Sequence, residues 1–313
     1  MPNEKLAELV EVMEGIAKIK KYNRMHAFTP YPKQRIFFEA GAQYRERLFR
    51  AGNQVGKTMG GSFEAVCHAT GDYPKWWKGK RFDRPNKGWC CGIKAKDVRD
   101  GPQKLLCGEP GVEIEFGTGM IPKSRIIKKS LSRGVTDAYD TLQITHKTNG
   151  REDGVSTITF KSYEEGREGF QGITLDWAWC DEEGPMEVYS EILTRLRGDG
   201  IAYTTFTPLL GKTELVDRFE ADSADRVAIN MTIEEAEHWT KEEKEKRMSG
   251  YSSYERDCRA YGIPMMGHGR VFPFDTEILI EDALTYIPPH WFALWGIDFG
   301  IGHPFAAVLI LWD

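Results

Sequence analysis

Apolar and polar residues follow two different periods along the chain. Over residues 4–24 the apolar positions recur every three or four residues, which is typical of an amphipathic helix. Short continuous apolar runs, such as residues 177–180, indicate buried strands. Helices are predicted over 4–24, 35–41, 57–70, 97–106, 186–197, 233–249 and 252–261, and strands over 45–52, 87–93, 141–146, 155–161, 173–180, 201–207 and 226–232.

The order of these elements predicts the fold class. Strands that alternate with helices are typical of an α/β fold, in which helices cover both faces of a parallel sheet. We expect residues 1–212 to form this core together with the N-terminal helical segment, and residues 213–289 to form a smaller subdomain. Residues 290–313 carry two further apolar strands, joined by the tight GIGHP turn, and are expected to form a third part.

Composition and charge narrow the class of protein. Of the 313 residues 41% are hydrophobic and 28% are charged, as in a globular protein. The net charge of −5 argues against a uniformly basic nucleic-acid-binding protein. No apolar run approaches the length of a membrane span, and residues 1–24 mix Lys with Glu, unlike a secretory signal. Six cysteines without a CxxC pair indicate reduced thiols. We expect a cytosolic protein without a membrane partner.

The segment AGNQVGKT, residues 51–58, lies between a predicted strand and a predicted helix. This placement is typical of a P-loop, whose backbone N–H groups and following helix N-terminus bind phosphate. Lys57 would contact the β- and γ-phosphates, and the Thr58 hydroxyl would bind Mg²⁺. The motif departs from G-x-x-x-x-G-K-[ST], because Ala51 replaces the first glycine. The predicted ATP-binding residues are Gly52, Asn53, Gln54, Val55, Gly56, Lys57 and Thr58.

Three acidic residues, Asp181, Glu182 and Glu183, follow the apolar residues 177–180. At a strand end near the P-loop, Asp181 would bind the Mg²⁺ that Thr58 holds, and Glu182 would orient and deprotonate the attacking water. Glu183 is the alternative base. A solvated acidic helix start would give the same residues, but the upstream P-loop favours hydrolysis.

Upstream of the P-loop, FTPYPKQ places Gln34 eighteen residues before Gly52. A Gln amide offers a donor and an acceptor together, which matches the edge of an adenine base. Phe28 or Tyr31 could stack on that base. Simple packing of an aromatic residue beside proline is the alternative interpretation.

Together these segments resemble the large terminase subunit of tailed bacteriophages, the motor that pumps DNA into a procapsid. The resemblance rests on FTPYPKQ, AGNQVGKT, WAWCDEE, TTFTPLLG at 204–211 and GIDFG at 296–300. It spans nearly the whole chain from Phe28. It implies a RecA-like (ASCE) P-loop NTPase sheet, a small lid or linker subdomain over 213–289, and the first hairpin of an RNase H-like nuclease domain over 290–313.

In that family the TTFTPLLG segment corresponds to a coupling motif, whose hydroxyls sense the γ-phosphate and transmit hydrolysis to movement. The resemblance assigns this role to Thr205 and Thr207. Threonine is also common at the ends of strands, which is the alternative explanation.

Many members of the family carry an arginine in the P-loop, where this chain has Asn53. The cation that stabilises the transferring phosphate would then come from elsewhere, and such an arginine finger contributes roughly 10³–10⁵ in rate. Arg167, in YEEGREGFQG, is the candidate, acting on a neighbouring subunit, and Arg50 is the alternative. A lone loop arginine can equally be a surface charge.

The resemblance further implies a C-terminal two-metal nuclease that uses Mg²⁺ or Mn²⁺. Asp298 in LWGIDFG matches the first acid of its metal site. Because two-metal catalysis needs several carboxylates, we expect the remaining acids on later strands that these 313 residues do not include. The chain is therefore expected to hydrolyse ATP and not to cleave DNA. The alternative is that Asp298 begins a turn.

As a motor subunit, the chain would translocate double-stranded viral DNA. The expected partners are that DNA, the portal protein of the procapsid, the small terminase subunit and further copies of the chain in a ring. The expected location is the cytoplasm of the infected bacterial host, and transiently the procapsid portal, but not the mature virion. The alternatives are another nucleic-acid-dependent P-loop ATPase, such as a helicase or restriction-type translocase, and a non-catalytic nucleotide-binding scaffold.

Overall fold

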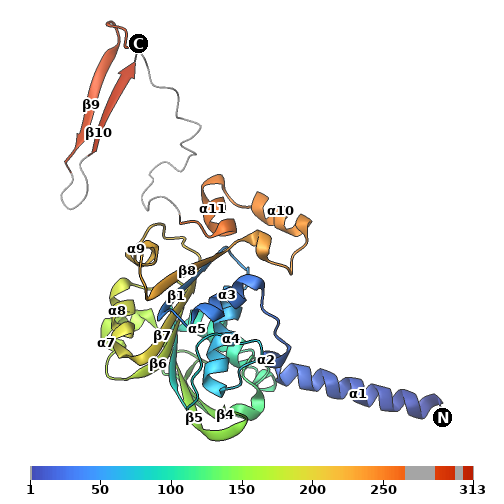
Figure 1. The fold of residues 1–313 in the computed structure, drawn as a ribbon. Coiled ribbons are helices and arrows are strands. Elements are labelled where there is room, and N and C mark those ends of the chain that lie inside the picture. Colours follow the sequence, from blue (N-terminus) through green and yellow to red (C-terminus); the bar gives the residue numbers. More distant parts are fainter. Residues whose placement is uncertain (1, 265–285, 300–305, 313) are drawn as a thin grey trace. The chain divides into compact units, whose positions relative to one another are not determined.

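The computed structural model describes residues 2–264, 286–299 and 306–312 (Figure 1). Contacts divide the chain into two compact units, Met1–Val271 and Phe272–Asp313. The first unit holds an eight-stranded sheet, and a two-stranded sheet lies in the second. None of the described helices is both long and apolar enough to cross a membrane.

The eight-stranded sheet has the order β3-β4-β5-β2-β6-β7-β1-β8. The six strands from β5 to β8 in this order run parallel, which confirms the predicted α/β class. The strands are β1 (Glu46–Ala51), β2 (Lys87–Gly92), β3 (Ile126–Leu131), β4 (Tyr139–Thr148), β5 (Arg151–Ser162), β6 (Leu175–Asp181), β7 (Leu196–Phe206) and β8 (Arg226–Met231).

One end of the sheet is antiparallel, which differs from the wholly parallel sheet that we predicted. Strand β4 pairs antiparallel with both β3 and β5. Asn149 and Gly150 join β4 to β5 with φ angles of 53° and 79°. Two central residues with positive φ make the tight turn of a hairpin, and Asn-Gly is the sequence most typical of it. This signal was present in the sequence but was not used.

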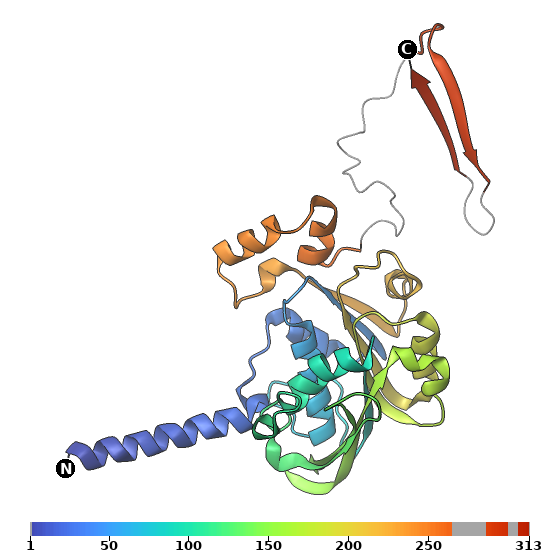
Figure 2. The same cartoon turned by 180° about the vertical axis from the view of Figure 1, so that it is seen from behind.

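Helices cover both faces of the sheet, as Figures 1 and 2 show from opposite sides. Helices α3 and α4 pack in one apolar cluster with Phe49, and α7, α8 and α9 pack in a second cluster with Leu48. The helices are α1 (Pro2–Tyr22), α2 (Arg24–Ala27), α3 (Pro32–Ala40), α4 (Lys57–Thr70), α5 (Ala95–Val98), α6 (Lys104–Cys107), α7 (Gly166–Gly169), α8 (Met186–Arg195), α9 (Glu214–Glu220), α10 (Lys241–Ser249) and α11 (Ser253–Tyr261).

Short turns interrupt two of the predicted helices. The helix predicted over 97–106 contains a π-helical turn, Arg99–Gln103, in which Pro102 removes a backbone donor. The helix predicted over 233–249 is a 3₁₀ turn followed by α10, because the Thr240 side chain accepts the N–H of Glu243 and starts a new helix there. Strand β3 and helix α9 were not predicted. The exposed edge strand has no continuous apolar run, and α9 is only seven residues long.

Strand β8 belongs to the sheet. It pairs with β1 in the register Arg50↔Asn230. The boundary that we predicted between residues 212 and 213 would separate two hydrogen-bonded neighbours. The smaller subdomain that we propose therefore starts after Met231, and within the described residues it contains α10 and α11.

A buried ion pair joins β1 to α4. Arg47 donates to both carboxylate oxygens of Glu64, at 2.5 and 3.1 Å, and to the carbonyl of Phe37 in α3 at 2.8 Å. Burial by itself raises the pKa of Glu64, but Arg47 and His68 hold it below its ordinary value. The two elements that flank the P-loop are thus connected by charges that are fully buried.

The second unit contains the antiparallel strands β9 (Phe292–Asp298) and β10 (Ala306–Trp312), with Ala306 opposite Asp298. The two C-terminal strands that we predicted are therefore present. The GIGHP turn between them, residues 300–304, lies outside the described residues.

Candidate active site

The predicted site segments meet at one edge of the sheet. Strands β6, β7 and β1 are parallel neighbours, with Asp181 opposite Thr205 and Arg50 opposite Phe206. The carboxyl ends of adjacent parallel strands open on the same side, where α/β proteins bind ligands. The structure therefore brings together the P-loop, the acidic residues and the TTFTPLLG segment, three regions that are far apart in the sequence.

The P-loop connects β1 to α4 through residues with left-handed backbone conformations. Gln54 has a φ of 57° and Gly56 a φ of 92°. In the described part of the chain, no acceptor receives a hydrogen bond from the backbone amides of residues 54–58. Successive amides of this kind at a helix N-terminus form an anion-binding nest. The geometry fits the phosphate chain of a nucleotide.

Lys57 lies at the centre of the site and is only 6% exposed. Its Nζ donates to the Gly52 carbonyl at 2.9 Å and to Thr207 Oγ1 at 2.7 Å. Burial lowers its pKa, while the nearby carboxylates of Glu182 and Asp181 raise it. No carboxylate in the described residues forms an ion pair with it. A buried ammonium without an ion-pair partner is costly, and a bound phosphate would supply the missing negative charge.

Asp181 ends β6 and is 7% exposed. Its Oδ1 accepts the Thr205 hydroxyl at 2.7 Å, and it is also hydrogen-bonded to the Thr58 side chain. Burial, followed by the negative charge of Glu182, raises the pKa of Asp181 to about 7. A hydroxyl and a carboxylate in contact are the oxygen ligands that Mg²⁺ prefers. Thr58 and Asp181 therefore fit the predicted metal role.

Glu182 and Glu183 have different surroundings. Glu182 has a φ of 62°, an unusual backbone conformation for a non-glycine residue, and its N–H donates to the Thr205 carbonyl at 2.9 Å. Burial raises its pKa, and the Lys57 charge lowers it. Strained conformations of this kind cluster at functional sites. Glu183 instead accepts the hydroxyl of Thr213, which caps α9. This difference favours Glu182 as the base.

Gln34 lies against the P-loop and is 2% exposed. Its amide Nε2 donates to the Gly56 carbonyl at 2.8 Å, and its Oε1 accepts the Tyr31 N–H at 2.9 Å. These bonds connect the start of α3 to the loop. The adenine role of Gln34 stays a prediction. Phe28 packs 4.5 Å from the Phe63 ring, centroid to centroid.

Helix α11 supports the start of the P-loop, which sequence reasoning missed. The N–H of Asn53 donates to the Arg259 carbonyl at 2.8 Å, and the N–H of Gly52 to the Met231 carbonyl at 3.3 Å. A Cβ at Gly52 would lie 2.5 Å from the Arg259 carbonyl oxygen. Glycine is therefore required for close packing here. The amides of Gly52 and Asn53 bond to the chain itself, so only those from Gln54 onward remain for phosphate.

The two candidate arginine fingers have partners within the chain. Arg167 donates to the buried Glu191 of α8 at 3.0 Å, although its own side chain is 64% exposed. Arg50 forms an ion pair with Glu220 at 3.1 Å. The exposure of Arg167 is compatible with a role at a neighbouring subunit, which stays a prediction.

Asp298 lies at the end of β9, in the second unit. Across residues 2–264, 286–299 and 306–312, no three His, Cys, Asp or Glu side chains converge as a metal site. The nuclease role of Asp298 is therefore an untested expectation.

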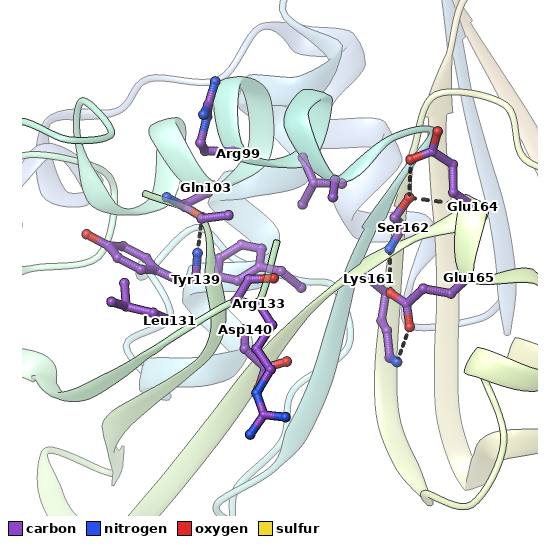
Figure 3. A pocket seen from close by; sticks show the side chains of 15 residues that line it. Arg99, Gln103, Leu131, Arg133, Tyr139, Asp140, Lys161, Ser162, Glu164 and Glu165 are labelled. Carbon is purple, nitrogen blue, oxygen red and sulfur yellow. Dashed lines mark hydrogen bonds and ion pairs between the residues drawn. The ribbon is translucent and has the colours of Figure 1, made fainter. Parts of the chain in front are cut away.

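A separate pocket of about 570 Å³ lies near the π-helical turn Arg99–Gln103 (Figure 3). Many of its polar groups bond to one another. The Tyr139 N–H donates to Gln103 Oε1 at 2.7 Å, and Lys161 donates to Glu165 Oε2 at 2.6 Å. The P-loop and the acidic residues do not line it. We therefore place the active site at the P-loop rather than in this pocket.

Comparisons with known proteins agree with this geometry. Residues 48–277 match the family model described as "Terminase large subunit, T4likevirus-type, N-terminal". The large terminase subunit of Salmonella phage P22 is 39% identical over 328 aligned positions, which cover all of this chain and 66% of the relative. The chain thus spans about two thirds of that relative's length.

Solved structures show the same fold. The large terminase ATPase domain of Thermus phage P74-26 superposes with a TM-score of 0.55 at 17% identity, covering 78% of this chain and 96% of that one. The large terminase of another thermophilic bacteriophage, in complex with ATP-gamma-S, gives a TM-score of 0.53 at 17% identity, covering 90% of this chain and 64% of that one. The fold of the ATPase domain and the match over residues 48–277 together establish that the chain belongs to the terminase large subunit family.

Proposed function

We propose that this chain hydrolyses ATP to drive the packaging of double-stranded viral DNA into a procapsid. The observation that carries the proposal is the convergence of Lys57, Asp181 and Glu182 at one sheet edge, beside free P-loop amides. A non-catalytic scaffold would need the loop but not the acidic residues. One large terminase of the same fold was solved in complex with ATP-gamma-S, which supports the choice of nucleotide.

In this proposal each residue has one task. Lys57 and the amides of residues 54–58 bind the phosphates. Thr58 and Asp181 hold Mg²⁺, which when bound stabilises the charge that develops on the phosphate oxygens. Glu182 orients the attacking water and accepts its proton. The buried surroundings of Glu182 raise its pKa, which makes the carboxylate a stronger base than an exposed glutamate.

Thr205 and Thr207 are placed to transmit the state of the site. Thr205 donates to Asp181 and accepts the Trp179 indole N–H at 2.9 Å. Thr207 accepts a bond from Lys57 and donates to the Ala51 carbonyl at 2.8 Å. Both hydroxyls are therefore bonded to groups that change partner when nucleotide and metal bind. We propose that they couple hydrolysis to movement.

The wider account rests on the family. We propose that the chain acts as part of a ring of copies, with Arg167 reaching a neighbouring site, together with a portal protein and a small terminase subunit. We also propose that Asp298 begins a nuclease metal site in a longer chain. The proposed location, in an infected bacterial cytoplasm and transiently at the portal, follows from the same account.

The direct test is ATP hydrolysis by Lys57→Ala. The variant should remain folded and lose hydrolysis, because the phosphates lose their buried cation. Lys78→Ala is the matched control, since that lysine is exposed and far from any P-loop contact in the structure. Unchanged turnover in Lys57→Ala would contradict the proposal. Stimulation by DNA that requires procapsids separates a packaging motor from a helicase or restriction-type translocase, which DNA alone would stimulate.

A further inference from the structure

A second pocket, of about 560 Å³, lies between the P-loop and α10. Its lining includes Asn53 and Gln54 of the loop, and Glu243, Lys246 and Arg247 of α10. Two cations from the smaller subdomain therefore line a cavity whose opposite wall is the phosphate-binding loop.

Arg247 is held in position from two sides. Its Nη1 donates to Gln54 Oε1 at 2.6 Å, and its guanidinium lies 4.0 Å from the centroid of the Trp239 ring. A guanidinium carries five N–H donors, of which Gln54 uses one. In the part of the chain that the structure describes, no carboxylate pairs with Arg247. The side chain is anchored but retains donors and an uncompensated charge.

The acidic residue in the pocket has another role. The Glu243 carboxylate accepts the Thr240 N–H at 2.8 Å in the capping box that starts α10. Glu243 is therefore committed to the helix end, and Lys246 and Arg247 leave the pocket attractive to an anion.

The segment that carries Arg247 also contacts the predicted base-binding side of the site. Tyr31 Oη and His238 Nδ1 are 2.7 Å apart, and Lys33 lies 3.5 Å from Glu235. The residues from Glu235 to Arg247 thus extend from the start of α3 to the P-loop. This arrangement is that of a wall along a bound nucleotide.

We propose that Arg247 is a second phosphate-binding cation of the nucleotide site, which contacts the polyphosphate chain of ATP from α10 while Lys57 contacts it from the P-loop. The proposal rests on the proposed ATPase function. It gives the smaller subdomain a direct part in nucleotide binding. It also supplies a cation beside Asn53, within the same chain.

The test is calorimetric titration of Mg²⁺–ATP and Mg²⁺–ADP into the 313-residue chain and its variants. Arg247→Ala should weaken ATP binding on the order of tenfold or more, and ADP binding less, because a charge-assisted hydrogen bond to phosphate is lost. Arg247→Lys keeps the charge and should lie between Arg247→Ala and the unchanged chain. Lys241→Ala removes a cation from the same helix outside the pocket and should leave both affinities unchanged.

Gln54→Ala separates phosphate binding from a role in shaping the loop. It removes the partner of Arg247 but leaves the guanidinium, so the preference for ATP over ADP should be retained. The proposal is overturned if Arg247→Ala binds ATP as tightly as the unchanged chain, if it loses ATP and ADP equally, or if Gln54→Ala reproduces its loss of preference. If Arg247→Ala does not fold, a fall in the ATP preference of Arg247→Lys supports the proposal, and an unchanged preference refutes it. Failure of the unchanged chain to bind ATP would instead refute the proposed function.

Discussion

Lys57 Nζ donates to Thr207 Oγ1 at 2.7 Å, so the P-loop lysine is bonded directly to the segment that follows β7. The same hydroxyl donates to the carbonyl of Ala51, where β1 ends. A phosphate that binds Lys57 competes with Thr207 for the ammonium protons. The occupancy of the site is thereby linked to the position of the chain after β7.

Thr207→Val should reduce hydrolysis by roughly tenfold or more, because a hydrogen bond to a charged group contributes about 1.5–3 kcal/mol. Nucleotide binding should be weakened less, since the loop amides and Lys57 remain. Thr207→Ser keeps the hydroxyl and is the matched control. Steady-state hydrolysis with a parallel binding titration checks the prediction. Equal activity of the Val and Ser variants would remove the Thr207 hydroxyl from the coupling role.

The sequence predicted the site better than its support. Local patterns were sufficient for the P-loop, for the acidic residues after an apolar strand and for the parallel strands, because each is encoded in a few neighbouring residues. The contact of Thr207 with Lys57 spans 150 residues, and only the strand order brings these side chains together. The packing of Arg259 against Asn53 likewise depends on where α11 folds back. Such long-range contacts leave no local periodicity.

The antiparallel edge and the buried Arg47–Glu64 pair were missed for different reasons. Asn149 and Gly150 carried a usable hairpin signal in the sequence. Arg47 carried none, because a charged residue in a strand normally indicates an exposed face. Only the structure shows that Glu64 of the next helix neutralises it.

The pKa of Asp181 makes the stability of the ligand-free chain depend on pH. Its folded pKa is raised to about 7 from an ordinary value of 3.8, so the folded state holds a proton that the unfolded state releases between these values. Stability is therefore lost as the pH rises from about 4 to about 7. Asp181→Asn removes this loss and should gain stability relative to the unchanged chain, by at most roughly 4 kcal/mol above pH 7.

Melting temperatures of both proteins at pH 5 and pH 8, without Mg²⁺ or nucleotide, check this prediction. The advantage of Asp181→Asn should be larger at pH 8. Mg²⁺ with ATP should stabilise only the unchanged chain strongly, because the metal binds the deprotonated carboxylate. An advantage that does not change with pH would show that Asp181 is ionised in the folded chain throughout this range.

Removal of one partner of the buried pair should destabilise the whole core. Arg47→Met leaves the Glu64 carboxylate buried without its main cation, which costs about 3–5 kcal/mol. The double variant Arg47→Met, Glu64→Gln should recover part of that loss, because it leaves no unpaired charge. Urea unfolding of the three proteins measures the difference. A double variant no more stable than Arg47→Met would contradict the ion-pair explanation.

Arg167 should matter only between subunits. Arg167→Ala should hydrolyse ATP normally in dilute monomer and poorly in assembled rings, and mixing it with the unchanged chain should reduce activity more than in proportion. Glu191→Gln removes the partner of Arg167 within the chain but keeps the arginine, and so serves as the control. A proportional loss in both monomer and ring would refute a finger that acts on a neighbouring subunit.

The central claim is that the P-loop and the acidic strand end form one hydrolytic site with Glu182 as its base. The most direct measurement is ATP binding and single-turnover hydrolysis by Glu182→Gln and, in parallel, Glu183→Gln. The account predicts that Glu182→Gln binds ATP with Mg²⁺ but hydrolyses it at least about a hundredfold more slowly, because the amide cannot accept the proton of the water. Glu183→Gln should retain most activity, since that carboxylate bonds to Thr213. Normal hydrolysis by Glu182→Gln together with an inactive Glu183→Gln would contradict it.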